Sequence, residues 1–184
     1  MPALALEKSQ YPDDLLDGFA AQDEERQWWA VYTKARQEKA IVRQLVAQQV
    51  PCYLPLVEKN QVVRGRRTRS YQPVFGGYLF LFGNDDDRVT ALQTNRVSQM
   101  LSVPDGQDFC GDLRRVRELI AANAPLTVES RLEAGQAVRI KNGPLAGLEG
   151  TIIQRRNSSR LLIAVKYLQQ GVSVQIDDYL VEPI

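Results

Sequence analysis

Histidine is absent from this 184-residue chain, and only two cysteines, Cys52 and Cys110, occur. Without imidazole, the sequence excludes Ser-His-Asp triads, most zinc sites and histidine acid–base chemistry. Two cysteines cannot build a metal cluster, and their scarcity favours a reducing, cytoplasmic compartment. We therefore expect no metal, no cofactor and no enzymatic activity, and we expect Cys52 to be a buried structural thiol.

Long apolar runs are also missing, so no stretch approaches the length of a membrane span. The first 27 residues contain no basic region followed by an apolar core, so we do not expect a secretory signal. Apolar residues still make up 44% of the chain, which is enough for a hydrophobic core. The length suits one ordinary domain or two small ones.

The net charge is only +1, but the charges are unevenly distributed. Residues 1–27 carry seven acidic side chains against two basic ones, whereas residues 34–71 carry nine basic side chains against two acidic ones. This asymmetry predicts a surface on the first folded domain that faces a polyanion. An ordinary solvated face is the alternative interpretation.

Hydrophobic periodicity predicts an α+β domain over residues 28–122, after a loosely ordered acidic extension over residues 1–27. We expect a four-stranded antiparallel sheet with flanking helices and a basic hairpin whose tip is Gly65. The expected strands are 28–33, 51–57, 78–82 and 97–103, and the expected helices are 37–49, a short one from Asp85, and 111–122. Asp85, Asp86 and Asp87 suit a helix cap better than the metal site of a nuclease, because consecutive carboxylates point in different directions.

Residues 123–132 have a weak pattern and are expected to be a linker to a second domain over residues 133–184. That domain reads as five short strands separated by turns. The expected strands are 136–141, 150–155, 161–167, 171–176 and 179–181.

A glycine-rich turn between two of these strands has a specific residue order. Its motif consists of Gly135, Val138, Ile140, Gly143, Pro144, Gly147, Leu148 and Gly150. This order resembles the KOW motif of NusG-type transcription factors and some ribosomal proteins. The resemblance implies a small SH3-like barrel that binds protein or RNA.

The first domain shows a second resemblance. Residues 28–32 (WWAVY) and 75–80 (FGGYLF) are similar to the start and centre of the NusG N-terminal domain. Residues 50–55 and the basic hairpin are closer to its specialised RfaH-type members. The resemblance implies a monomeric, RfaH-like elongation and antitermination factor. A housekeeping NusG and an RNA- or ribosome-binding KOW protein remain the alternatives, although a net charge of +1 is low for the latter.

The resemblance also implies a surface that docks onto the clamp helices of RNA polymerase. Tyr32, Phe75, Tyr78 and Phe80 match positions in or beside it, and Thr90 lies near the loop that faces the polymerase gate loop. Some of these rings can belong to the core instead, because neighbours along a strand face opposite ways. We therefore favour Tyr32 and Tyr78 as the exposed pair. Gly76 departs from the family, which usually has proline there.

Contact with the displaced non-template DNA strand is implied as well. Lys34, Asn95 and Arg96 match positions of that contact, and Gln44 stands where RfaH-type proteins have a recognition histidine. The basic charges add phosphate-binding candidates. These are Arg36, Arg64, Arg66, Arg67 and Arg69.

In the second domain, the loop around Leu148 resembles the NusG site for a ribosomal small-subunit protein and for termination factor Rho. Leucine would keep an apolar side chain there in place of the usual phenylalanine. The glutamate that ties the two RfaH domains together is Gln72 here, and β-branched residues follow the turn. We therefore expect no stable helical, autoinhibited form.

Overall fold

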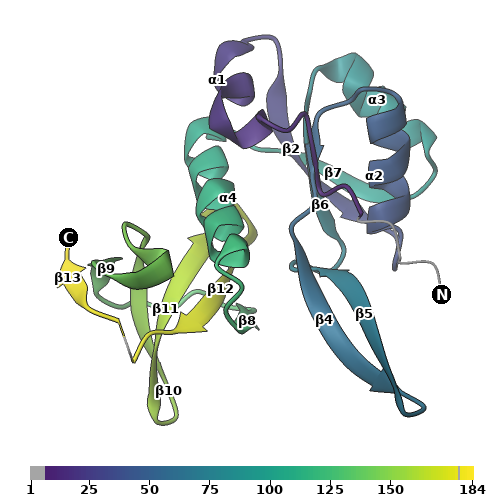
Figure 1. Ribbon diagram of the computed structural model, residues 1–184. Coiled ribbons are helices and arrows are strands. Elements are labelled where there is room, and N and C mark those ends of the chain that lie inside the picture. The colour runs from purple at the N-terminus through teal and green to yellow at the C-terminus, as the bar shows by residue number, and fades with distance from the viewer. Residues whose placement is uncertain (1–6, 178) are drawn as a thin grey trace. The chain divides into compact units, whose positions relative to one another are not determined.

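The computed structural model describes residues 7–177 and 179–184 (Figure 1). The expected extension therefore begins, over residues 1–6, outside the described part. The chain divides into two compact units, Met1–Gly106 and Gln107–Ile184, which we call the N-terminal and C-terminal units. Both contain antiparallel sheets and few helices, which confirms the mixed α/β expectation.

The N-terminal unit combines short helices with an open sheet and a separate hairpin. Its elements are β1 (Gln10–Tyr11), η1 (Leu15–Phe19), α1 (Ala20–Gln22), β2 (Gln27–Thr33), α2 (Glu38–Ala47), β3 (Cys52–Tyr53), β4 (Leu56–Val63), β5 (Arg66–Pro73), β6 (Tyr78–Gly83), α3 (Asp85–Gln93) and β7 (Val97–Ser102). The helices over 37–49 and from Asp85 are thereby confirmed to within a few residues.

The main sheet has five strands in the order β1-β3-β6-β2-β7, where four were expected. The fifth strand is β1, because Gln10 and Tyr11 pair with Tyr53 and Cys52. The expected strand over 51–57 contributes only β3 to this sheet, since it is interrupted before β4, where Pro55 contributes a carbonyl but no N–H. Strands β4 and β5 then leave the main sheet and pair with each other.

The core of this unit lies between the sheet and the two helices α2 and α3. Val31 of β2 and Leu79 of β6 are buried against Ile41 and Leu45 of α2 and Ala91 of α3. Ile41 and Leu45 belong to the apolar stripe that the sequence predicts for this helix. The fully buried Cys52 is in the same cluster, and burial raises the pKa of its thiol to about 12.

The N-terminal extension is more ordered than expected over its described part. Leu15 and Leu16 of η1 are fully buried. The Leu54 N–H donates to the Ser9 carbonyl at 2.7 Å, and β1 pairs with β3. The expectation of a loose acidic tail is thus wrong for residues 7–27, because two adjacent leucines supply apolar surface to the fold.

The hairpin β4–β5 confirms the expected basic tip. Arg64 and Gly65 adopt φ of 50° and 76°, which suits a two-residue turn that joins Val63 to Arg66. Figure 1 shows the two strands projecting beyond the main sheet as a narrow ribbon.

The C-terminal unit is built on a six-stranded antiparallel sheet of order β13-β9-β10-β11-β12-β8. Its elements are α4 (Gly106–Ala121), β8 (Leu126–Glu129), β9 (Ala137–Ile140), η2 (Gly143–Leu145), β10 (Glu149–Arg155), β11 (Ser158–Val165), η3 (Lys166–Leu168), β12 (Gln170–Gln175) and β13 (Val181–Pro183). The five strands expected between residues 136 and 181 are present, with bounds shifted by up to three residues.

Two features of this unit differ from the expectation. The segment 123–132 contains β8, which pairs with β12, so it is not a plain linker. Helix α4, from Gln107 onward, belongs to this unit. The buried Asp112 carboxylate accepts the Lys166 N–H at 3.0 Å, and the Phe109 and Tyr167 rings lie 6.0 Å apart edge to face, so α4 contacts η3. Among the helices of the described residues, none is both long and apolar enough to cross a membrane.

Removing a buried leucine side chain tests whether the extension belongs to the core. We expect Leu16→Ala to lower the free energy of unfolding by about 2–4 kcal/mol, because it leaves a cavity. Asp14→Ala, at an exposed position two residues away, should change it by less than about 0.5 kcal/mol. Urea unfolding followed by tryptophan fluorescence measures both, and an unchanged midpoint for Leu16→Ala would show that the segment is only loosely attached.

Candidate functional site

Two tyrosines lie opposite each other at one end of strands β2 and β6. Tyr32 and Tyr78 are register partners, and their ring centroids are 5.1 Å apart. Tyr32 is 42% exposed and Tyr78 is partly exposed. The pair therefore presents aromatic area together with two hydroxyl groups at the surface.

The loop before Tyr78 is held by two backbone–backbone hydrogen bonds and one backbone–side-chain hydrogen bond. Tyr78 N–H donates to the Phe75 carbonyl at 3.0 Å, and Thr33 N–H donates to the Gly77 carbonyl at 2.8 Å. Gly77 N–H in turn donates to the Glu38 carboxylate at 2.8 Å, and Glu38 is a buried residue at the start of α2. The loop is thus tied both to β2 and to α2.

Gly77 is the residue that this arrangement requires. Its φ is +84°, and a Cβ there would lie 2.9 Å from Cε2 of Tyr32. At Gly76 a Cβ would meet nothing within 4 Å. The substitution of glycine for the family's proline therefore falls at a position with open space around it.

Two of the predicted interface aromatics are buried. Phe75 is 1% exposed and Phe80 is 0% exposed, and their ring centroids are 6.4 Å apart. The expectation that they lie in a docking surface is therefore corrected: Phe80 shares the sheet face of Tyr32 and Tyr78, but both phenylalanines are covered by other residues. Strand periodicity shows which side chains share a sheet face, but it does not show which of them other elements cover.

Leu101 was missed by the sequence reasoning. It lies opposite Ala30 in the β2–β7 register, on the same face as Tyr32, and is 38% exposed. Opposite neighbours in a sheet share a face. The sequence signal that could have indicated this position is an apolar residue in a strand at the sheet edge. Leu101 adds apolar area to the sheet face that carries Tyr32.

Thr90 lies on α3, and its hydroxyl donates to the Asp86 carbonyl at 3.0 Å. Its neighbours Val89 and Leu92 are exposed. The exposed surface of α3 around this threonine is therefore mixed, because Asp86 and Gln93 are exposed as well. The helix begins at a capping box, in which Asn84 accepts the Asp87 N–H and Asp87 accepts the Asn84 N–H, both at 3.0 Å.

Lys34, Asn95 and Arg96 come together although they are 61 residues apart in sequence. The Lys34 ammonium donates to the Asn95 carbonyl at 2.7 Å, and the Lys34 N–H donates to the Arg96 carbonyl at 2.8 Å. The Arg96 guanidinium also donates to the Gln37 side chain. The loops before α2 and before β7 thus form one basic surface.

Two further candidates adjoin this basic surface. Arg36 is exposed in the same loop as Lys34. Gln44 lies seven positions after Gln37, which places it two turns along the same side of α2. The five nucleic-acid candidates outside the hairpin therefore share one region of the N-terminal unit.

Four arginines lie in the hairpin β4–β5 and its turn. Arg64, Arg66 and Arg67 are exposed around its tip. Arg69 instead pairs with Glu58 across the ribbon at 2.9 Å. The three tip residues are therefore the hairpin cations best placed to reach a polyanion.

The apolar residues of the KOW-like motif lie in the core of the C-terminal unit. Val138 and Ile140 are buried, and Leu148 is only 3% exposed. The expected apolar contact at Leu148 is thus corrected, because its side chain packs inward. The sequence around Leu148 does not show whether its side chain faces the surface or the core.

The glycines of the motif serve close approach and tight turns. A Cβ at Gly135 would lie 2.1 Å from the Ile152 carbonyl oxygen, and one at Gly150 would lie 2.6 Å from that of Leu162. Gly143 and Gly147 adopt φ of +76° and +89° on either side of Pro144, the second residue of η2. The glycines shape the turn, and Pro144 between them is exposed.

Within the described residues, no group of three or more histidine, cysteine or acidic side chains is arranged to hold a metal ion.

Comparison with known proteins finds a family match that covers most of the N-terminal unit and the start of α4. Residues 26–111 match the family model described as transcription termination factor nusG. The match contains the tyrosine pair, the basic surface and the hairpin, and it ends within α4.

A solved chain from a crystal structure of the MjSpt4:Spt5 complex, conformation B, is also similar. Its sequence identity is 16%, the alignment covers 85% of this chain and 97% of that chain, and the TM-score is 0.26. A TM-score this low does not establish a shared fold.

Adding a methyl group at Gly77 tests how the tyrosine pair is positioned. We expect Gly77→Ala to destabilise the protein by about 1–2 kcal/mol, because alanine disfavours positive φ and its Cβ meets the Tyr32 ring. Gly76→Ala is the matched control and should stay within about 0.5 kcal/mol. Thermal unfolding measures both, and equal midpoints for the two variants would contradict the role assigned to Gly77.

Proposed function

We propose that this chain, whose residues 26–111 match the NusG family model, is a transcription elongation factor that binds the clamp helices of RNA polymerase and suppresses pausing. The observation that carries the proposal is the tyrosine pair within the matched segment. An exposed aromatic pair on a rigid sheet suits docking onto a helical partner.

The proposed polymerase contact consists of Tyr32, Tyr78 and Leu101. All three are at least partly exposed, and Tyr32 and Leu101 lie on one sheet face. Phe75 and Phe80 are buried and are left out of this contact. The exposed surface of α3 around Thr90 is a second contact, directed at the gate loop.

Contact with the non-template DNA strand is proposed for the basic surface around Lys34, Asn95 and Arg96, extended by Arg36 and Gln44. Their charges suit phosphate oxygens, which position a protein without reading sequence. The hairpin tip is a second such contact, since its three arginines are exposed.

We further propose that the C-terminal unit is a KOW barrel that recruits a second protein, such as a ribosomal small-subunit protein or Rho. Its sheet and the glycine geometry of the motif support a barrel rather than a helical, autoinhibited form. Burial of Leu148 directs the search for the contact to other residues of that loop.

The basic hairpin favours a specialised, RfaH-like factor, and a housekeeping NusG is the alternative. The proposed domains are residues 28–122 and 133–184. Helix α4 after Gly106 nevertheless groups with the C-terminal unit, and β8 adds a strand to its sheet.

Truncating one tyrosine tests the polymerase contact. We expect Tyr78→Ala to weaken capture of core RNA polymerase by about 10- to 100-fold, as for a buried aromatic anchor at an interface. Leu180→Ala removes an exposed apolar side chain from the other unit and should bind as the wild type does. A quantitative pull-down compares them, and equal recovery by Tyr78→Ala would reject the assignment.

Neutralising the hairpin tip tests the nucleic-acid contact. We expect the triple variant Arg64→Gln, Arg66→Gln, Arg67→Gln to bind single-stranded DNA more weakly and with a smaller salt dependence. The slope of log K against log salt should fall by about 0.7 for each phosphate that the variant no longer neutralises. Fluorescence anisotropy between about 50 and 200 mM salt measures it. The ion-paired Arg69→Gln should have a smaller effect, and an unchanged slope in the triple variant would assign the hairpin to solubility alone.

A further inference from the structure

The ribbon formed by β4 and β5 has two different faces. Residues that pair across an antiparallel ribbon lie on the same face. On one face, Leu56 is buried and Tyr71 packs against the core of the N-terminal unit. The same face carries Glu58 and Arg69, which form an ion pair at 2.9 Å. We call it the anchored face, and the opposite one the free face.

The free face carries cations and uncharged polar groups but no acidic side chain. Toward the tip it consists of three register pairs, which are Lys59 with Ser70, Gln61 with Thr68, and Val63 with Arg66. All of these side chains are exposed except Ser70, which is partly exposed. The Thr68 hydroxyl donates to the Gln61 carbonyl at 3.2 Å, and in the described part of the chain the Gln61 side-chain amide makes no hydrogen bond. Amide and hydroxyl groups between two cations therefore remain for a ligand.

These side-chain types are the ones that recognise base edges in the major groove of DNA. A glutamine amide can pair with N6 and N7 of adenine, and a guanidinium or ammonium group donates to O6 and N7 of guanine. Methyl groups such as those of threonine and valine suit contact with the thymine methyl. Cations alone suffice for phosphate contacts, whereas Gln61 and Thr68 add groups that can distinguish one base from another.

The shape of the ribbon also fits that groove. The major groove of B-form DNA is about 12 Å wide and admits a two-stranded β-ribbon, whose strands lie about 4.8 Å apart. Strands β4 and β5 are each 8 residues long and project beyond the main sheet (Figure 1). Residues 56–73 contain five basic side chains and one acidic one, so the phosphates that border the groove would meet positive charge.

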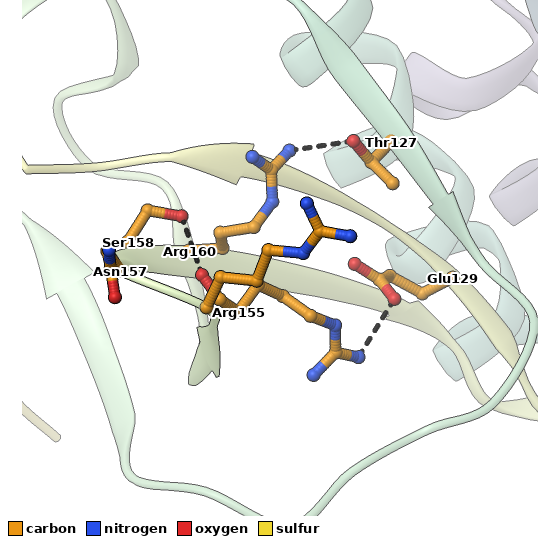
Figure 2. A pocket seen from close by; sticks show the side chains of 7 residues that line it. Thr127, Glu129, Arg155, Asn157, Ser158 and Arg160 are labelled. Atoms are coloured by element: carbon orange, nitrogen blue, oxygen red, sulfur yellow. Dashed lines mark hydrogen bonds and ion pairs between the residues drawn. The ribbon is translucent and has the colours of Figure 1, made fainter.

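A second group of arginines, in the C-terminal unit, is less suited to a polyanion. It lines a cavity of about 680 Å³ beside β8 (Figure 2). Figure 2 shows Arg155 bonded to Glu129, at 2.9 Å, and Arg155 also pairs with Glu133 at 2.8 Å. Acidic groups thus offset much of the positive charge of the cavity, whereas the free face of the ribbon contains none.

We infer that the free face of β4–β5 enters the major groove of duplex DNA and reads base edges through Gln61, Lys59 and Arg66. The single-strand contact proposed above requires only phosphates at the hairpin tip. The present contact adds a duplex and a preference for sequence. It rests on the proposed function in one respect, that the chain works on transcribed DNA, and the composition and shape of the ribbon stand without it.

The experiment uses the full chain and a pool of short DNA duplexes with a randomised centre, from which bound molecules are separated and sequenced. Gln61→Ala is compared with Asn60→Ala, which removes an exposed amide from the neighbouring position on the anchored face. We expect the wild type and Asn60→Ala to enrich the same motif, and Gln61→Ala to lose the preference at one base pair of it by about tenfold. Enrichment of no motif by the wild type, or of one motif by all three proteins, would overturn base readout by the ribbon.

Modified duplexes of the enriched sequence establish which groove is read. Replacing its purines by 7-deazapurines removes the N7 acceptors from the major groove and should weaken binding about tenfold, measured by fluorescence anisotropy. Replacing its guanines by hypoxanthine removes only the minor-groove amino group and should leave the affinity unchanged. The reverse order of effects would contradict the assignment to the major groove.

Two further arms separate this contact from others. An RNA duplex of the same sequence should bind more weakly, because side chains cannot read its deep, narrow major groove. Equal binding of the RNA duplex would reduce the contact to phosphates and reject the inference. Polymerase capture and binding of single-stranded oligodeoxythymidylate by Gln61→Ala should equal those of the wild type, so this inference and the proposed function can fail separately.

Discussion

A hydrogen bond from the Gly77 amide to the buried Glu38 carboxylate holds the candidate polymerase surface together. It connects the start of α2 with the loop that precedes β6. The Thr33 amide holds the same glycine from the β2 side. With the loop fixed from two elements, the Tyr78 ring has one position beside Tyr32, and a pre-positioned aromatic pair loses little conformational entropy on binding.

Elements with strong periodicity could be predicted from the sequence. Strand β2, helix α2, the hairpin turn at Gly65 and most strands of the C-terminal unit follow from local pattern and turn chemistry. The pairing of β1 and β8 could not be predicted, because a strand of two to four residues gains its stability from the neighbour it joins. The burial of Phe75 and Phe80 likewise depends on what packs against the sheet.

Some residues of the candidate site could likewise be predicted from the sequence, and others could not. Lys34, Asn95 and Arg96 could be named from resemblance, and the structure explains how they come to share one surface, since two loops far apart in sequence are bonded there. Leu101 could be found only from the β2–β7 register, which places it on the Tyr32 face of the sheet. The sequence shows which residues are charged or aromatic, but it does not show which residues each of them contacts.

The central claim is that the Tyr32 face contacts the polymerase. Site-specific photo-crosslinking from position 32 within a reconstituted elongation complex tests it most directly. We expect p-benzoylphenylalanine at position 32 to crosslink to the clamp helices of RNA polymerase, and the same group at exposed position 180 to give no such product. Crosslinks from position 32 to nucleic acid alone, or to no part of the complex, would contradict the account.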